Sequence, residues 1–365
     1  MFFAPFALFC SNSAMIKAKI VGATGYGGVG ITELLLRHPE VELNCLVAMA
    51  DVGKRMHEVY PHLAGFCELP IVAPDDPSAQ EPVDVVFFAT PDRVAMVGAP
   101  AEIERGAKVI DYSGDFRFSS LATYEDYARR LGKEPEHLAP ELLEESVYGL
   151  PELHRMQIAG ARVVGNVGCF ASGVILGLAP AVAGRFINPD TIICDCKSGV
   201  SGAGKKPAAT FHYPARQDAM NAYRLTGHQH VCEIETQLGG IADAEILITF
   251  TAQVVPANRG ILGCLYADLA DGLSYDEVLE GYREFHAHNH FVRVYDRLAA
   301  VSTMHVRGTN FCNLVVDVDE RTNRLRVISH IDNLMKGQAG NALQNMNLMF
   351  GFDETVGLDR PGQDP

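Results

Sequence analysis

The chain has 365 residues, of which 48% are hydrophobic and 21% are charged, so it can bury a large core and form two domains. Its formal net charge of −15 argues against a protein that binds by neutralising nucleic-acid phosphates, and we expect no nucleic-acid partner. The nine cysteines include no CxxC pair, which is typical of a soluble cytoplasmic protein with reduced thiols.

Residues 1–14 (MFFAPFALFCSNSA) are apolar enough to suggest a signal peptide, but they lack a positively charged start. A strand pattern begins directly after Met15, so we interpret residues 1–14 as an N-terminal extension and Met15 as the native start. No other stretch contains 18 or more apolar residues, and we expect no membrane-spanning segment.

Residues 17–22 (KAKIVG) have the pattern of a buried strand, and a glycine-rich turn and the helical pattern ITELLLRH follow it. This is how a Rossmann fold begins. Further strands are predicted at Val41–Ala48, Val83–Thr90 and Lys108–Tyr112, with helical segments between some of them. The alternation predicts an α/β fold with a doubly wound parallel sheet. We expect residues 15–165 to form an NAD(P)-binding domain.

The glycine-rich turn lies between the first strand and the first helix. Glycines there let the backbone approach a pyrophosphate, and the helix N-terminus faces its negative charge. An ordinary glycine-rich turn is the alternative, but the strand before it and the amphipathic helix after it favour dinucleotide binding. The predicted cofactor-binding residues of this turn are Gly22, Thr24, Gly25, Tyr26, Gly27 and Gly28.

Cys169 lies in a glycine-flanked turn (VGNVGCFASG) that precedes the apolar helical run VILGLAPAVAG. We therefore expect its sulfur near a helix N-terminus, a position that lowers a thiol pKa and favours the reactive thiolate. A buried structural cysteine is the alternative for any of the nine cysteines. Placement at a helix start singles out Cys169, and we predict that it is a nucleophile.

After residue 165 the predicted strands are separated by long loops or helices, which indicates a mixed or antiparallel α+β domain over residues 166–335. The segment Gly337–Met349 has a helical pattern with small and apolar residues on one face. We expect a helix over residues 336–351 that packs back on the first domain. The predicted strands of the second domain are Thr191–Cys196, Glu245–Val255, Gly263–Asp268, Cys312–Asp319 and Leu325–Ile331.

Two segments carry cations suited to an oxyanion. The loop Lys197–Lys206 combines small residues with lysines, a composition that suits binding of a phosphate or carboxylate through backbone N–H groups. Arg117 has a planar guanidinium that suits bidentate binding. The alternatives are a solvated flexible loop for the first segment and, for Arg117, an ion pair with Asp115 or Asp111.

The segment GHQHVC supplies His228 and His230, and a catalytic thiol needs a neighbour that accepts and returns a proton near neutral pH. We expect one of the two histidines to be this base. On a strand, alternation would place both histidines and Cys232 on one face, which could instead suggest a zinc site. Because the sequence offers no matching fourth ligand cluster, we expect no metal.

Seven ordered blocks stand out along the chain: GATGYGGVGITELLLRHP, GKRMHEVYPHL, DYSGDFRF, LAPELLEESVYGLPEL, SGVSGAGKKP, VVPANRGIL and DNLMKGQAGNALQNMNLMFG. Together these blocks resemble the N-acetyl-gamma-glutamyl-phosphate reductase family. The resemblance implies a Rossmann domain joined to a catalytic domain of the aldehyde-dehydrogenase-like type, shared with aspartate-semialdehyde dehydrogenase and glyceraldehyde-phosphate dehydrogenase. It also implies reduction of N-acetylglutamyl phosphate with NADPH, releasing phosphate and N-acetylglutamate semialdehyde.

The resemblance places the family's nucleophile on Cys169 and its catalytic histidine on His228. We expect a small-molecule acyl phosphate as substrate and a homodimer or homotetramer. The expected substrate-binding residues are Arg117, Asn166, Ser198, Lys205 and His230. The expected cofactor-binding residues outside the glycine-rich turn are Ala48, Lys54, Ser201, Gly202 and Asn333.

The chain departs from the family pattern at the nucleophile and at the cofactor. The usual Asn-Pro-Gly-Cys-Tyr-Pro-Thr turn reads NVGCFAS here, so two prolines are lost while the thiol stays. The usual Ser-Arg-Ser after the second strand, which suits a 2′-phosphate, is replaced by AMAD, ending at Asp51. Asp51 would favour NADH, whereas Lys54 and Arg55 could bind the 2′-phosphate. We expect NADP(H), with NAD(H) as the alternative.

Two other functions compete with this interpretation. A reductase of a carrier-linked aminoadipyl or glutamyl phosphate would need a basic docking surface, and the acidic chain has no cationic cluster beyond Lys205-Lys206. A dinucleotide-sensing regulator without catalysis would have no need of both Cys169 and His228.

Overall fold

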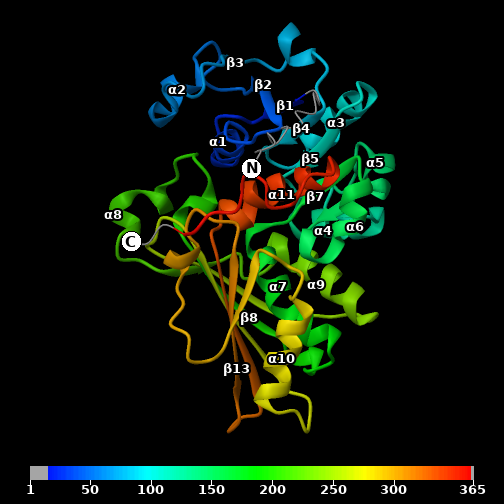
Figure 1. Ribbon diagram of the computed structural model, residues 1–365, viewed down its shortest axis with the longest axis vertical. Helices are drawn as coiled ribbons and strands as arrows, with labels where there is room; N and C mark the ends of the chain where they lie inside the picture. The colour runs from blue at the N-terminus through cyan, green and yellow to red at the C-terminus, as the bar shows by residue number, and fades with distance from the viewer. Residues whose placement is uncertain (1–14, 363–365) are drawn as a thin grey trace, which may run out of the picture.

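The computed structural model describes residues 15–362, and the predicted extension at residues 1–14 lies outside them. Two sheets follow one another along the long axis of the molecule, with the first half of the chain at the top of Figure 1 and the second half below it. Within the described residues, none of the helices is both long and apolar enough to cross a membrane.

The first sheet has seven parallel strands in the order β3-β2-β1-β4-β5-β7-β6, which confirms the doubly wound arrangement predicted from the sequence. Both of its faces are buried: along β4, Val85 and Phe87 join one core, and Val86 and Phe88 join another. Coverage of both faces explains why β4 (VVFF) is apolar throughout. The strands are β1 (Ile16–Val21), β2 (Val41–Val47), β3 (Ile71–Val72), β4 (Val85–Phe88), β5 (Lys108–Asp111), β6 (Val147–Gly149) and β7 (Val163–Asn166).

The helices of this half alternate with the strands. The first core contains residues of α1, and the second contains residues of α3 and α4. The helices are α1 (Tyr26–Leu35), α2 (Met56–Val59), α3 (Ala95–Glu104), α4 (Leu121–Arg130), α5 (Pro140–Glu145) and α6 (Pro151–Gly160), with 3-10 turns η1 (Pro61–Leu63) and η2 (Pro77–Gln80).

The second sheet is mixed, as expected, with the order β12-β13-β14-β11-β8-β10-β9. Burial alternates strictly along β11, so one face of the sheet is covered and the other is half-exposed. The strands are β8 (Ile193–Ser198), β9 (Asn221–Tyr223), β10 (Thr249–Val254), β11 (Ile261–Asp268), β12 (Val292–Tyr295), β13 (Cys312–Asp319) and β14 (Arg324–Ile331).

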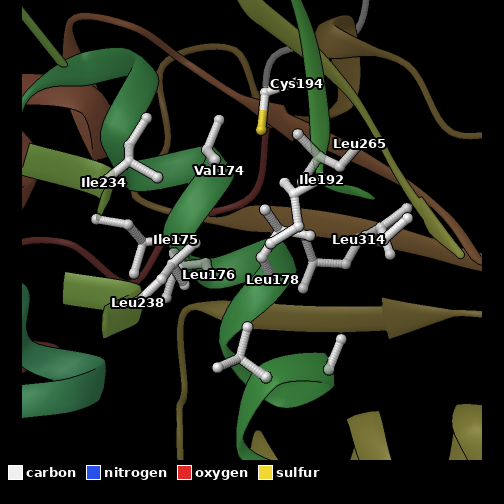
Figure 2. Packing of buried hydrophobic residues seen from close by; sticks show 14 of the residues in the cluster. Val174, Ile175, Leu176, Leu178, Ile192, Cys194, Ile234, Leu238, Leu265 and Leu314 are labelled. Carbon is white, nitrogen blue, oxygen red and sulfur yellow. The ribbon is translucent and has the colours of Figure 1, made fainter. Parts of the chain in front are cut away.

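Helix α7 (Cys169–Ala183) lies on the covered face of this sheet. Its apolar side chains pack between strand residues such as Cys194 and Leu265 and, on the other side, Ile234 and Leu238 of α9 (Figure 2). This packing fixes the helix that begins at the predicted nucleophile. The other elements of this half are α8 (Tyr213–Arg216), α9 (Gln229–Ala242), α10 (Tyr275–Phe285), η3 (Pro189–Thr191), η4 (Val200–Ala203), η5 (Ala209–Phe211) and η6 (Thr303–Val306).

The end of the chain returns to the first sheet. A π-helix, η7 (Met335–Ala339), runs into α11 (Gly340–Met349), which packs against α1 and α6. The predicted face of small and apolar residues is confirmed, since Ala342, Leu343 and Met346 join the first core. The opposite, polar face is also buried: Asn341 and Asn345 donate to the Gly149 carbonyl, and Leu348 is the one residue of the helix that is not buried. An element buried all round lies between the two halves of the molecule rather than on one surface.

Candidate active site

Cys169 is the first residue of α7, with Gly168 as the helix N-cap, so the predicted helix start is confirmed. The expected low thiol pKa is not found: burial raises the pKa of Cys169 to about 11, although Arg117 and the backbone N–H of Phe170 act in the opposite direction. Loss of water outweighs the favourable charge of the helix start at this position. The thiol therefore needs a base to become a nucleophile at neutral pH.

A buried carboxylate supports the nucleophile turn. Glu233 of α9 accepts hydrogen bonds at Oε1 from the Gly168 backbone N–H and the Tyr148 hydroxyl, both at 2.7 Å. Its Oε2 lies 3.3 Å from Nη1 of Arg117, and the side chains of this pair are 7% and 1% exposed. The turn that presents Cys169 is thus tied to a charged network that the sequence analysis missed.

Arg117 forms an ion pair, but with another partner than Asp115 or Asp111. Its guanidinium donates to the backbone carbonyls of Asn166 (2.8 Å) and Tyr112 (2.7 Å) as well as pairing with Glu233. Its ion-pair partner is therefore Glu233, and neither Asp115 nor Asp111. With these three acceptors, the guanidinium joins the segment after β5, β7 and α9.

The two histidines lie at the start of a helix, so the strand interpretation of this segment is wrong. His228 is the N-cap of α9, and its Nδ1 accepts the backbone N–H of His230 at 3.2 Å. Residues 228–232 are too few for alternation to distinguish a strand from the start of a helix. Cys232 instead joins the core beneath the first sheet. Within residues 15–362, no group of three or more potential ligands could hold a metal ion.

His230 lies against the nucleophile turn. A Cβ built on Gly168 would be 2.4 Å from His230 Nε2, so only glycine fits there. Burial lowers the pKa of His228 to about 4 and the pKa of His230 well below its ordinary value, so both imidazoles are neutral at pH 7. Both histidines and Cys169 line one pocket of about 430 Å³.

The remaining predicted substrate residues divide into two groups. Ser198 lines the 430 Å³ pocket, and its hydroxyl donates to the Gly199 carbonyl. Asn166 lines a neighbouring pocket, but its side-chain oxygen accepts from the amides of Asn341 and Asn345 at 2.9 and 3.0 Å. Lys205 reaches the first half of the molecule, where its Nζ lies 4.6 Å from the centre of the Tyr60 ring.

The glycine-rich turn is built for close approach of the backbone. Gly22 has φ +87°, and a Cβ there would lie 2.4 Å from the Ala89 carbonyl oxygen. A Cβ on Gly28 would lie 2.3 Å from the Gly22 oxygen, so Gly28 is needed for packing of the turn itself. The Tyr60 hydroxyl donates to the Thr24 carbonyl at 2.9 Å and holds the tip of the turn.

A pocket of about 270 Å³ joins this turn to the nucleophile. It is lined by residues of the turn, by Cys169 and by the end of the chain. The buried Thr90 Oγ1, Tyr112 Oη and Gln338 Oε1 line it and have no hydrogen-bond partner among the described residues. Unsatisfied buried polar atoms at one place fit a ligand that carries both donors and acceptors, as a nicotinamide carboxamide does.

The predicted residues that line this 270 Å³ pocket come from both halves of the chain. Asn333 donates from Nδ2 to the Ser201 hydroxyl at 3.0 Å, which links the end of the chain to η4. The residues are Gly25, Tyr26, Gly27, Arg117, Asn166, Cys169, Ser201, Gly202, Lys205, His230 and Asn333.

A third pocket of about 720 Å³ continues from the glycine-rich turn over the first sheet and includes Gly22, Thr24, Gly25 and Ala48. Lys54 lies outside all three pockets, where it pairs with Asp51 at 2.7 Å on the surface. Gly28 also lies outside them. Of the residues that sequence analysis missed, Thr90 follows β4, and the rule that ligands bind at the carboxyl ends of parallel strands could have found it.

Comparison with known proteins gives consistent matches. The family model described as "Semialdehyde dehydrogenase, NAD binding domain" matches residues 17–161, and "Semialdehyde dehydrogenase, dimerisation domain" matches residues 169–333. The N-acetyl-gamma-glutamyl-phosphate reductase of Syntrophobacter fumaroxidans is 43% identical, covering 96% of this chain and 100% of its own length. The protein of the same name from Geobacter metallireducens is also 43% identical, covering 94% and 98%.

Similar solved structures support the fold. Aspartate semialdehyde dehydrogenase II from Vibrio cholerae has a TM-score of 0.70 at 18% identity, covering 92% of this chain and 99% of that chain. Aspartate semialdehyde dehydrogenase with NADP from Candida albicans has a TM-score of 0.64 at 15% identity, covering 94% and 99%. At such identities the likeness concerns the architecture alone.

Proposed function

The chain belongs to the N-acetyl-gamma-glutamyl-phosphate reductase family, and we propose that it reduces N-acetylglutamyl 5-phosphate to N-acetylglutamate 5-semialdehyde and phosphate. This is a step of arginine biosynthesis. One observation carries the proposal: Cys169, at a helix start, lines both a pocket with two neutral histidines and a pocket with the glycine-rich turn.

The first half of the reaction is acyl transfer to the thiol. A neutral imidazole takes the Cys169 proton, the sulfur attacks the acyl carbon, and the carbon–oxygen bond to phosphate breaks, leaving a thioester. We assign the base to His230, in place of His228, because its Nε2 lies beside Gly168 whereas His228 Nδ1 caps α9. The backbone N–H groups at the start of α7 stabilise the developing oxyanion.

The second half of the reaction releases the aldehyde. NADPH, when bound along the glycine-rich turn, supplies a hydride to the thioester carbon. As the thiohemiacetal collapses and the aldehyde leaves, His230 returns the proton taken in the first half to the sulfur and restores the thiol, while the released phosphate takes its proton from water. Thr90, Tyr112 and Gln338 are the residues that would hold the nicotinamide end, since their polar atoms have no partner among residues 15–362.

The reverse reaction tests the proposed function. Purified protein is mixed with N-acetylglutamate 5-semialdehyde and NADP⁺, and NADPH formation is followed at 340 nm with and without phosphate. We expect continued NADPH formation only with phosphate, because the thioester must be released by a phosphate oxygen; without phosphate, NADPH formation should stop after a single turnover of each site. No NADPH formation, or equal rates without phosphate, would contradict the proposal.

The chain also carries features of an oligomer. Its second half matches a dimerisation-domain model, and the second sheet leaves one face half-exposed. We propose a homodimer that buries this face, to be checked by light scattering after gel filtration; a monomer at micromolar concentration would contradict it.

We propose a cytoplasmic location for the protein, since all cysteines among residues 15–362 are free thiols.

The two family-model matches also support the proposed domain division. We propose an NAD(P)-binding domain at residues 15–165, a catalytic domain at residues 166–335, and residues 336–351 returning to the first.

A further inference from the structure

Among the described residues, one charged side chain lines the 430 Å³ pocket beside Cys169. Arg224 is the only Lys, Arg, Asp or Glu among the residues that line it, and burial keeps both histidines neutral. None of the described acidic side chains lies within ion-pair distance of Arg224. Its Nη1 instead donates to the neutral amide of Gln229 at 2.8 Å. A guanidinium without a carboxylate is available to an anionic ligand in this pocket.

The backbone holds Arg224 in place. It directly follows β9, whose residues Asn221–Tyr223 pair antiparallel with β10. Beside it, the buried Arg216 donates to the carbonyls of Ala219 and Val254 and to the side chain of Asn221, so the preceding loop is tied to the sheet. Arg224 has φ +46°, a left-handed conformation that arginine rarely adopts. Such a conformation persists only where the surrounding structure holds the residue in place.

The rest of the pocket is largely apolar. Phe170, Val200, Phe211, Tyr223 and Val254 line it together with Cys169. The pocket thus offers a thiol, one cation and an apolar wall within one volume. These suit a short acyl chain that reacts at one end and carries a carboxylate and a small apolar substituent at the other.

We propose that Arg224 binds the α-carboxylate of an N-acylated amino-acid acyl phosphate and that the apolar wall receives its N-acyl group. The proposal rests on the proposed function for the reacting carbonyl and adds the residue that selects substrates with a second carboxylate. An arginine that pairs with the carboxylate distinguishes this substrate from an acyl phosphate lacking it by about 10- to 100-fold, the range of charge-assisted hydrogen bonds.

Protection of Cys169 from iodoacetamide tests the proposal without turnover. The probes are N-acetylglutamate and 4-acetamidobutanoate, which is the same molecule without the α-carboxylate. In the wild type we expect half-protection by N-acetylglutamate at a concentration at least tenfold lower than by 4-acetamidobutanoate. In Arg224→Met the two concentrations become equal within about twofold, because only the N-acetylglutamate value rises. Arg224→Lys retains part of the difference.

Arg185→Met is the matched control. Arg185 is also an exposed arginine with positive φ (+54°), and it is not among the residues that line the pocket. This variant should keep the wild-type selectivity. Equal protection by both probes in the wild type, or unchanged selectivity in Arg224→Met with native circular dichroism, would overturn the assignment. A selective wild type that fails the phosphate-dependent assay above would instead refute the proposed reaction and leave the carboxylate site standing.

Discussion

The Glu233 network predicts a large effect from one isosteric substitution. Glu233→Gln keeps the shape and one acceptor oxygen, but it removes the charge opposite Arg117, whose side chain is 7% exposed. The bonds from Gly168 N–H and the Tyr148 hydroxyl also become bonds to a neutral amide. Breaking a buried ion pair by removal of one partner costs about 3–5 kcal/mol, because the other charge stays buried and unpaired. We expect the free energy of unfolding to fall by this amount.

The assay is guanidinium chloride unfolding followed by circular dichroism, with Glu235→Gln as the matched control. Glu235 lies on the same helix, but its partner Arg130 is 45% exposed at 3.4 Å, so its loss should cost about 1 kcal/mol. The double variant Glu233→Gln/Arg117→Met also removes the Arg117 charge, so no unpaired charge stays buried. It should therefore lose less free energy of unfolding than the two single variants lose together. Our interpretation of the network is wrong if Glu233→Gln and Glu235→Gln lower the free energy of unfolding equally. It is also wrong if the losses of Glu233→Gln and Arg117→Met simply add in the double variant.

Four further predictions concern the reaction. Cys169→Ser should abolish turnover while the dissociation constant for NADPH, measured by fluorescence, stays within about twofold; more than a few per cent activity would count against a thioester. His230→Asn should lower kcat by about 10²- to 10⁴-fold, and His228→Asn should lower it less; steady-state kinetics showing the reverse order would return the base to His228. Alkylation of Cys169 in the free protein should accelerate about tenfold per pH unit from pH 7 upward, because the raised pKa of about 11 keeps the thiol protonated there; a plateau below pH 8 would contradict this. NADPH should be preferred to NADH by kcat/KM, and Lys54→Ala/Arg55→Ala should reduce that preference by about tenfold, or ~1.4 kcal/mol. A preference for NADH in the wild type would show that the Asp51 carboxylate determines the choice of cofactor.

The sequence was sufficient for the longer strands of both sheets. Strand-like segments of the sequence predicted β1, β2, β4 and β5 and, after residue 165, the long strands of the second sheet. The strands that were missed have two to four residues, such as β3 (Ile71–Val72) and β9 (Asn221–Tyr223). So short a segment contains no measurable period, and its pairing is decided by neighbours that are distant in the sequence.

The candidate site likewise contains residues that the sequence predicted and residues that it could not predict. Cys169 was visible because a glycine turn and an apolar helix flank it, and both signals are local. Glu233 and Arg224 were not visible, since each is one charge among many until the fold brings it to the nucleophile. The direction of the Cys169 pKa was predicted wrongly for the same reason: the helix start is encoded locally, whereas the degree of burial depends on everything packed around the sulfur.

The end of the chain extends this argument from single residues to a wall of the site. A Cβ on Gly337 would lie 2.8 Å from Cys169 Cβ, and one on Gly27 would lie 3.0 Å from Nε2 of Gln338, so η7 touches both the nucleophile and the dinucleotide turn. Lys336 lies completely buried in the same π-helix, and its Nζ donates to Glu152 at 2.7 Å. This bond anchors η7 to α6. A π-helix in such a place is typical of a functional site. The distance between the Cys169 thiol and the cofactor turn therefore depends on η7, a segment about 170 residues after Cys169 in the sequence. Helix periodicity could predict this segment, but a contact over so long a sequence separation is set by the fold and could not be predicted from periodicity.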